Sequence, residues 1–126
     1  MKIASTIARY LLGALFTFAG LNGFFHFVGG QPPAGPAGNF VAAINATGYQ
    51  YVIFACQLIP GVLFLINRYV PLALCILGPV IVNIIGFHAF MAPAGLPMAV
   101  VVAILWILVA IRNKQHLAGI FAARTD

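Results

Sequence analysis

Charged residues are almost absent from long stretches of this chain. None occurs between Arg68 and Arg112, and only 6% of the 126 residues are charged, whereas 63% are hydrophobic. Soluble domains carry roughly 25% charged residues, which is enough to cover a surface that faces water. This chain has too few polar groups for such a surface, so the sequence predicts that lipid is the solvent for most of it.

Four apolar runs predict four membrane-spanning helices, because about 20 helical residues cross a hydrocarbon core of ~30 Å. The links between the runs contain Gly, Pro or polar residues that end helices, and short links make neighbouring helices antiparallel. The first run is too long for the apolar part of a cleaved signal peptide, so it is expected to remain as a span. The sequence therefore predicts one all-α domain over 1–126, an integral membrane four-helix bundle. Its spans are expected at 7–28, 40–66, 71–91 and 95–111.

The cationic residues predict the orientation of these spans. With four crossings, all six fall on one side of the membrane, and the links 29–39 and 92–97 carry no charge. Positive residues mark the cytoplasmic side, so both termini are expected in the cytoplasm, at the cytoplasmic (inner) membrane. The net charge of +5 does not indicate nucleic-acid binding, because the cations form no basic face interleaved with aromatic residues. The six are Lys2, Arg9, Arg68, Arg112, Lys114 and Arg124.

The tail 112–126 has a different pattern from the spans. Leu117, Ile120 and Phe121 recur at helical spacing beside basic residues, which is typical of a short helix lying on the membrane surface. A frayed tail is the alternative, because about ten residues barely support a helix in water.

A small set of polar residues lies inside the spans. At a rise of 1.5 Å per residue, the three amides are expected roughly 16 to 22 Å from the cytoplasmic end, and the two histidines roughly 25 to 30 Å from it. Intramembrane polar groups face other helices or a cavity. The sequence therefore predicts a polar, partly hydrated pocket that opens toward the outer face. Its candidate residues are Asn22, His26, Gln57, Asn83 and His88.

Other roles for these polar residues stay open at this stage. An amide can simply tie helices together, at about 0.6 kcal/mol per contact. Asn83 and His88 are five residues apart, roughly 140° around a helix, so they face different neighbours unless the helix is distorted. Two histidines are too few for a typical closed metal site, which uses four ligands. No metal and no catalytic residue is predicted, because Asp126 is the only acid and no nucleophile triad is present.

Two short motifs resemble the DoxX family of small four-helix membrane proteins. They are "NGFFH", which contains Asn22 and His26, and "NIIGFH", which contains Asn83 and His88. The resemblance covers 7–112 and rests on the order and spacing of the motifs. It implies a relation to the small membrane subunit of a thiosulfate:quinone oxidoreductase in a bacterial inner membrane. Two departures from the family pattern, Asn22-Gly23 where a basic residue is common and Gln57 where Glu is common, weigh against proton-coupled chemistry.

Two functions follow as expectations. The first is a membrane subunit that binds a quinone or another small lipophile for an oxidoreductase partner. The alternative is a non-catalytic anchor or scaffold for a partner protein. A transporter needs a polar track across the whole membrane, and the cytoplasmic half of the spans offers none. The sequence indicates lipid as a partner and leaves a homo-oligomer open.

Overall fold

The computed structural model describes residues 2–125, which are almost entirely helical and contain no strand. The chain runs through α1 (Lys2–Phe25), α2 (Gly35–Thr47), α3 (Gln50–Ile66), α4 (Val70–Phe90), the 3-10 turn η1 (Pro93–Gly95) and α5 (Leu96–Arg112). It ends with the short α6 (Lys114–Leu117) and the 3-10 turn η2 (Ala118–Phe121). The all-helical class expected from the sequence is confirmed.

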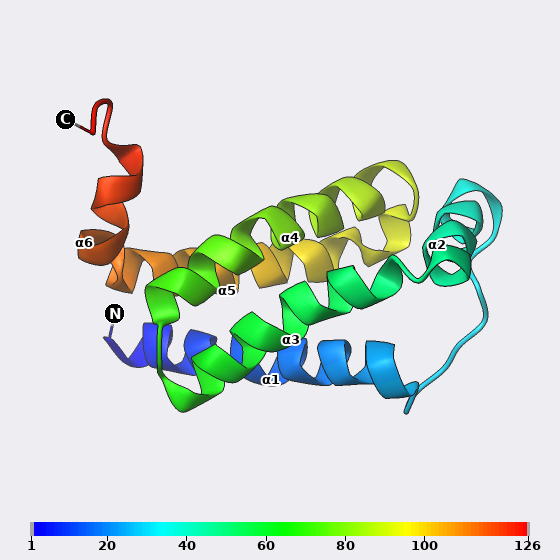
Figure 1. Ribbon diagram of the computed structural model, residues 1–126, viewed down its shortest axis with the longest axis horizontal. Coiled ribbons are helices and arrows are strands. Elements are labelled where there is room, and N and C mark those ends of the chain that lie inside the picture. Colours follow the sequence, from blue (N-terminus) through cyan, green and yellow to red (C-terminus); the bar gives the residue numbers. More distant parts are fainter. Residues whose placement is uncertain (1, 126) are drawn as a thin grey trace.

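The four longest helices, α1, α3, α4 and α5, lie side by side (Figure 1). Helix α1 packs against α3 and α5, and α4 packs against the same two helices. Short links after α3 and α4 make the consecutive helices antiparallel. Both ends of the chain consequently lie at one end of the molecule, and α2 lies at the other.

Three of the described helical segments are long and apolar enough to cross a membrane: α1, α4 and Pro93–Arg112. The pair α2 and α3 meets the same test only when the two helices are taken together, and they are bent by 91°. Large side chains that point away from the helix contacts are mostly apolar, as at Leu11, Phe18, Val82 and Ile104. These surfaces are suited to contact with lipid.

The 91° bend differs from the single tilted helix expected over 40–66. Gly48 ends α2 in a left-handed conformation with φ 80°, which glycine adopts without the strain that a Cβ would cause. The Thr47 hydroxyl donates to the Ala43 carbonyl oxygen and accepts a hydrogen bond from the Tyr49 amide. These local contacts stabilise the break, whereas Pro60 lies within α3 without ending it.

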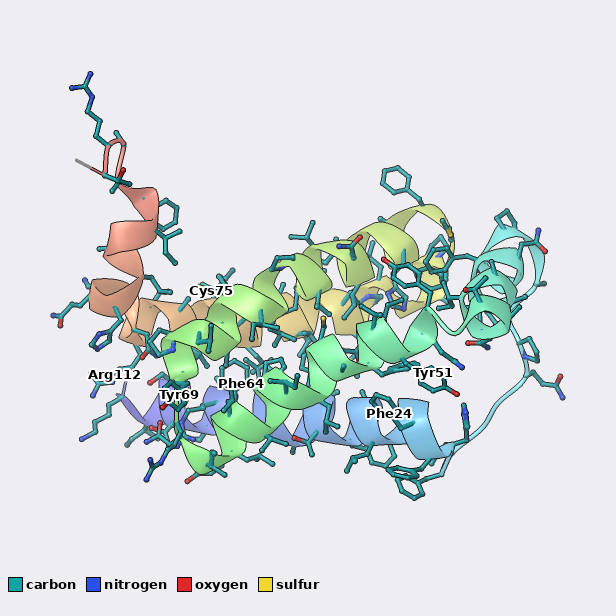
Figure 2. All side chains as sticks on the ribbon, viewed as in Figure 1. Phe24, Tyr51, Phe64, Tyr69, Cys75 and Arg112 are labelled. Carbon is teal, nitrogen blue, oxygen red and sulfur yellow. The ribbon has the colours of Figure 1, made fainter. Side chains whose placement is uncertain are left out.

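The contact between α1 and α3 is unusually close. A Cβ added at Gly20 would lie 2.6 Å from the Leu58 Cβ, and one added at Gly61 would lie 2.5 Å from the Thr17 amide nitrogen. Small residues allow membrane helices to approach in this way. The same contact continues toward α2, where Phe24 stacks on Tyr51 at 5.5 Å (Figure 2).

The apolar core occupies the half of the molecule nearer the chain ends. Phe64 of α3 is fully buried there (Figure 2), together with Leu12, Leu74, Leu77 and Val109. Trp106 of α5 closes one side of this core and donates from Nε1 to the Leu74 carbonyl oxygen at 3.1 Å. Among residues 2–125, two of the three buried polar residues, Gln50 and Gln57, belong to α3.

Candidate functional site

Asn22 lies in the last turn of α1, and its side-chain amide binds the backbone of the segment that follows this helix. Its Nδ2 donates to the Val28 carbonyl oxygen at 3.1 Å, and its Oδ1 accepts from the Val28 amide at 2.7 Å. Helix α1 therefore ends at Phe25 rather than at the expected residue 28, and His26 takes a left-handed conformation with φ 56°. His26 itself is exposed.

Asn83 lies on the exposed face of α4. Its Nδ2 donates to the Pro79 carbonyl oxygen, one turn earlier, at 2.8 Å. Both amide protons of an asparagine need acceptors in lipid, and a helix carbonyl of the same segment supplies one of them. Asn83 thus has a local partner that requires no shared pocket.

His88 is half-buried near the end of α4. Its Nδ1 lies 2.8 Å from the Ile84 carbonyl oxygen, and since a carbonyl only accepts, Nδ1 is the donor and a neutral ring keeps Nε2 as an acceptor. The ring packs so closely on Gly95 that a Cβ there would lie 2.3 Å from it. It also meets the Phe87 ring edge-on at 5.2 Å.

Gln57 is buried in α3, with 8% of its surface exposed. Gln50, which the sequence analysis did not select, is buried to the same extent. Seven residues make nearly two helical turns, so both amides lie on one face of α3. Phe64 continues this face into the apolar core.

Neither glutamine amide has a side-chain hydrogen bond within the part of the chain that the structure describes. The amide atoms are not enclosed, because neither glutamine is among the buried side-chain groups that lack a partner, so they remain open to water or a ligand. The spacing of seven could have revealed Gln50 from the sequence. Gln50 was not among the residues selected from the sequence, although it also lies in the expected span 40–66.

The five residues selected from the sequence do not share one environment. Gln57 is buried, Asn22 and His88 are half-buried, and His26 and Asn83 are exposed. Three of them already use the backbone of their own segment as a partner. Gln50 and Gln57 are the buried polar residues of α3.

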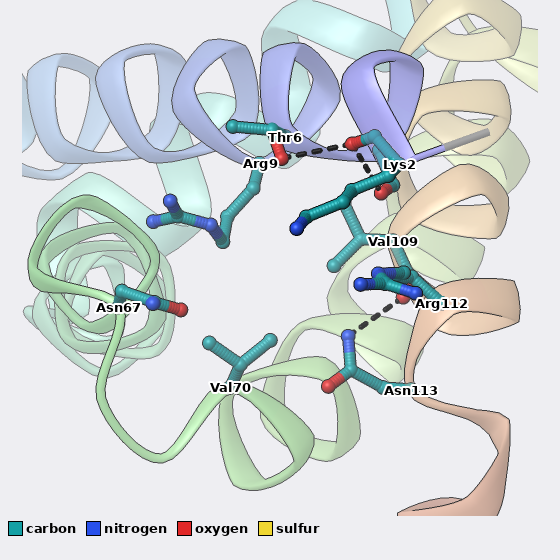
Figure 3. A pocket seen from close by; sticks show the side chains of 9 residues that line it. Lys2, Thr6, Arg9, Asn67, Val70, Val109, Arg112 and Asn113 are labelled. Carbon is teal, nitrogen blue, oxygen red and sulfur yellow. Dashed lines mark hydrogen bonds between the residues drawn. The ribbon is translucent and has the colours of Figure 1, made fainter.

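A second polar region lies at the opposite end of the molecule, beside the two chain ends (Figure 3). It is a cavity of about 330 Å³ between the first turns of α1, the link from α3 to α4 and the end of α5. Three cationic residues line it, Lys2, Arg9 and Arg112. No carboxylate side chain occurs anywhere in residues 1–125.

No family model, curated protein or solved structure matches this chain. The resemblance to the DoxX family rests on the two motifs that contain Asn22, His26, Asn83 and His88, and it stays a prediction. The geometry of the two polar regions is the basis for the functions proposed below.

Proposed function

We propose that the chain is an integral membrane four-helix bundle that crosses the bilayer four times, with both ends in the cytoplasm. Helices α1, α3, α4 and α5 are the crossings, and α2 lies at the outer membrane surface. At 1.5 Å per residue, the 17 residues of α3 extend about 25 Å, close to the thickness of the hydrocarbon core. The cations at the opposite end support this orientation.

Within this bundle, the proposed activity is binding of a small lipophile with a hydrogen-bonding head, of the quinone class, for a redox partner. The observation that carries the proposal is the pair Gln50 and Gln57 on one face of α3, whose side chains are mostly buried and whose amide atoms stay accessible without a hydrogen-bond partner. A glutamine Nε2 donates hydrogen bonds, and the carbonyl oxygens of a quinone accept them. The apolar surroundings suit the ring and tail of such a molecule.

Quinone titration of the purified protein in lipid nanodiscs tests this proposal. The unmodified protein should bind a short-tailed quinone saturably, as followed by quenching of Trp106 fluorescence. Gln57→Leu should weaken binding about tenfold, because losing a hydrogen bond to the ligand removes roughly 1 to 1.5 kcal/mol. Asn83→Leu is the matched control, since Asn83 is exposed and bonded within α4. Equal affinity in both variants contradicts the proposed site.

The second candidate function is a non-catalytic anchor or scaffold for a partner protein. It is favoured by the local hydrogen bonds of Asn22, Asn83 and His88, which need no ligand. In that case quinone should not bind, and deletion of the chain should release an oxidoreductase from the membrane fraction. Retention of every oxidoreductase activity in that fraction after deletion would count against a scaffold.

A further inference from the structure

The cavity between the chain ends concentrates positive charge. Lys2 and Arg9 come from one face of α1, since they lie seven residues apart. Arg112 reaches the same cavity from the end of α5 (Figure 3). Three cations around about 330 Å³ repel one another unless an anion lies between them. The chain supplies no side-chain anion for this purpose in residues 1–125.

Arg9 is held in place at the rim of the cavity. Its Nη1 donates to the Phe64 carbonyl oxygen at the end of α3, and its guanidinium lies 4.4 Å from the centre of the Tyr10 ring. A guanidinium has five N–H groups, so most of them stay available after this contact. Arg9 therefore positions α3 and still offers charge to the cavity.

Lys2 and Arg112 have no side-chain acceptor within the part of the chain that the structure describes. The hydroxyls of Ser5 and Thr6 both donate to the Lys2 carbonyl oxygen. The Asn113 Nδ2 donates to the Val109 carbonyl oxygen. The donors left for a ligand are consequently the ammonium of Lys2, the guanidinium groups and the amide of Asn67. Cationic N–H groups of this kind are donors that phosphate oxygens prefer.

We propose that this cavity binds the phosphate group of an anionic phospholipid from the cytoplasmic leaflet. Basic pockets between membrane helices on the cytoplasmic side are suited to such head groups. The inference goes beyond lipophile binding by Gln50 and Gln57. It rests on the proposed membrane crossing with both chain ends in the cytoplasm.

An apolar hollow close to the cavity favours a lipid over a free phosphate. It measures about 380 Å³ and lies between the end of α5 and the tail. Trp106, Ile107, Ile111 and Phe121 are among the residues that line it. Val109 and Arg112, on the neighbouring face of α5, line the basic cavity. A phospholipid has both parts, an anionic phosphate and acyl chains.

The test measures the preference for phosphatidylglycerol over phosphatidylcholine, by native mass spectrometry of the full chain titrated with each lipid. The test variant combines Lys2→Gln with Arg112→Gln. The matched control combines Arg68→Gln with Arg124→Gln, which removes the same charge from residues that line neither the cavity nor the apolar hollow. Circular dichroism in the same detergent confirms that both variants stay helical.

The test variant should lose its preference about 25-fold, at roughly fivefold for each cation. The control should lose less than about threefold, because its charges lie outside the cavity and contribute only a diffuse attraction that salt screens. Equal losses in the two variants would overturn the proposal and leave a diffuse surface attraction. Inorganic phosphate in excess should not displace the lipid. Displacement, or tight binding of phosphate by itself, would instead identify a soluble phosphate as the ligand and overturn the assignment to a lipid.

Discussion

Thr17 shows how strongly a single residue is constrained where α1 meets α3. Among residues 2–125, its Oγ1 is the one buried side-chain oxygen or nitrogen that lacks a hydrogen-bond partner. The hydroxyl faces Gly61, at the point where the two helices are closest. A buried hydroxyl without a partner lowers stability by roughly 1–3 kcal/mol.

Thr17→Val should therefore stabilise the protein by about 1 kcal/mol, because valine has nearly the same shape and no unpaired hydroxyl. Unfolding in mixed detergent micelles, followed by circular dichroism, measures the change. Thr6→Val is the control, since the Thr6 hydroxyl is exposed and donates to the Lys2 carbonyl oxygen. Its effect should stay within about 0.5 kcal/mol. A destabilised Thr17→Val variant would show that the hydroxyl has a partner.

At the scale of elements, the α1–α3 contact depends on small residues. Gly20→Ala should destabilise the protein by about 1–3 kcal/mol, because the added Cβ would meet the Leu58 backbone, with its Cα at 2.8 Å. Gly86→Ala in α4 is the matched control, since nothing lies within 4 Å of an added Cβ there. It should be neutral or stabilising by up to about 1 kcal/mol, as alanine favours helix. Similar losses in both variants would mean that α1 and α3 do not pack closely.

The tail forms α6 and η2 and turns away from the long helices (Figure 1). Leu117 and Phe121 line the apolar hollow beside α5, and both Phe121 and Ile120 remain exposed on the tail. Replacing all three with Ser should loosen the tail, and trypsin should then cut faster after Arg112 and Lys114. The rate of cleavage in proteoliposomes measures this. An unchanged rate would indicate a tail that is already free.

The positions of the long helices could be predicted from the sequence, whereas the bend between α2 and α3 and the side-chain hydrogen-bond partners could not. The apolar runs place α4 and α5 within a few residues of the expected spans, because length and composition dominate there. The bend at Gly48 was missed, since an isolated glycine in an apolar run does not reveal a left-handed conformation. The roles of Asn22 and Asn83 depend on local backbone partners that spacing alone does not identify. Gln50 and the basic cavity emerge only when distant segments are brought together.

On the scale of the whole molecule, cationic residues gather at one end of a set of apolar helices. Lys2 and Arg112, at the beginning of α1 and the end of α5, line one cavity. The first and last long helices thus start and finish at the same end of the molecule. If the structure lies in a membrane, this arrangement requires an even number of crossings. The crossing by α3 is the one that helix length does not decide, because α3 passes the length test only together with α2.

The central claim is the four-crossing topology, and paired reporters test it most directly. A green fluorescent protein and an alkaline phosphatase are fused in separate strains after Asp126 and within 29–34, the link that precedes α2. The account predicts fluorescence without phosphatase activity after Asp126, and the reverse in the link. Phosphatase activity after Asp126 with the link still outside would show that α2 and α3 turn back without crossing. That result would contradict both the four-helix membrane bundle and the cytoplasmic position of the basic cavity.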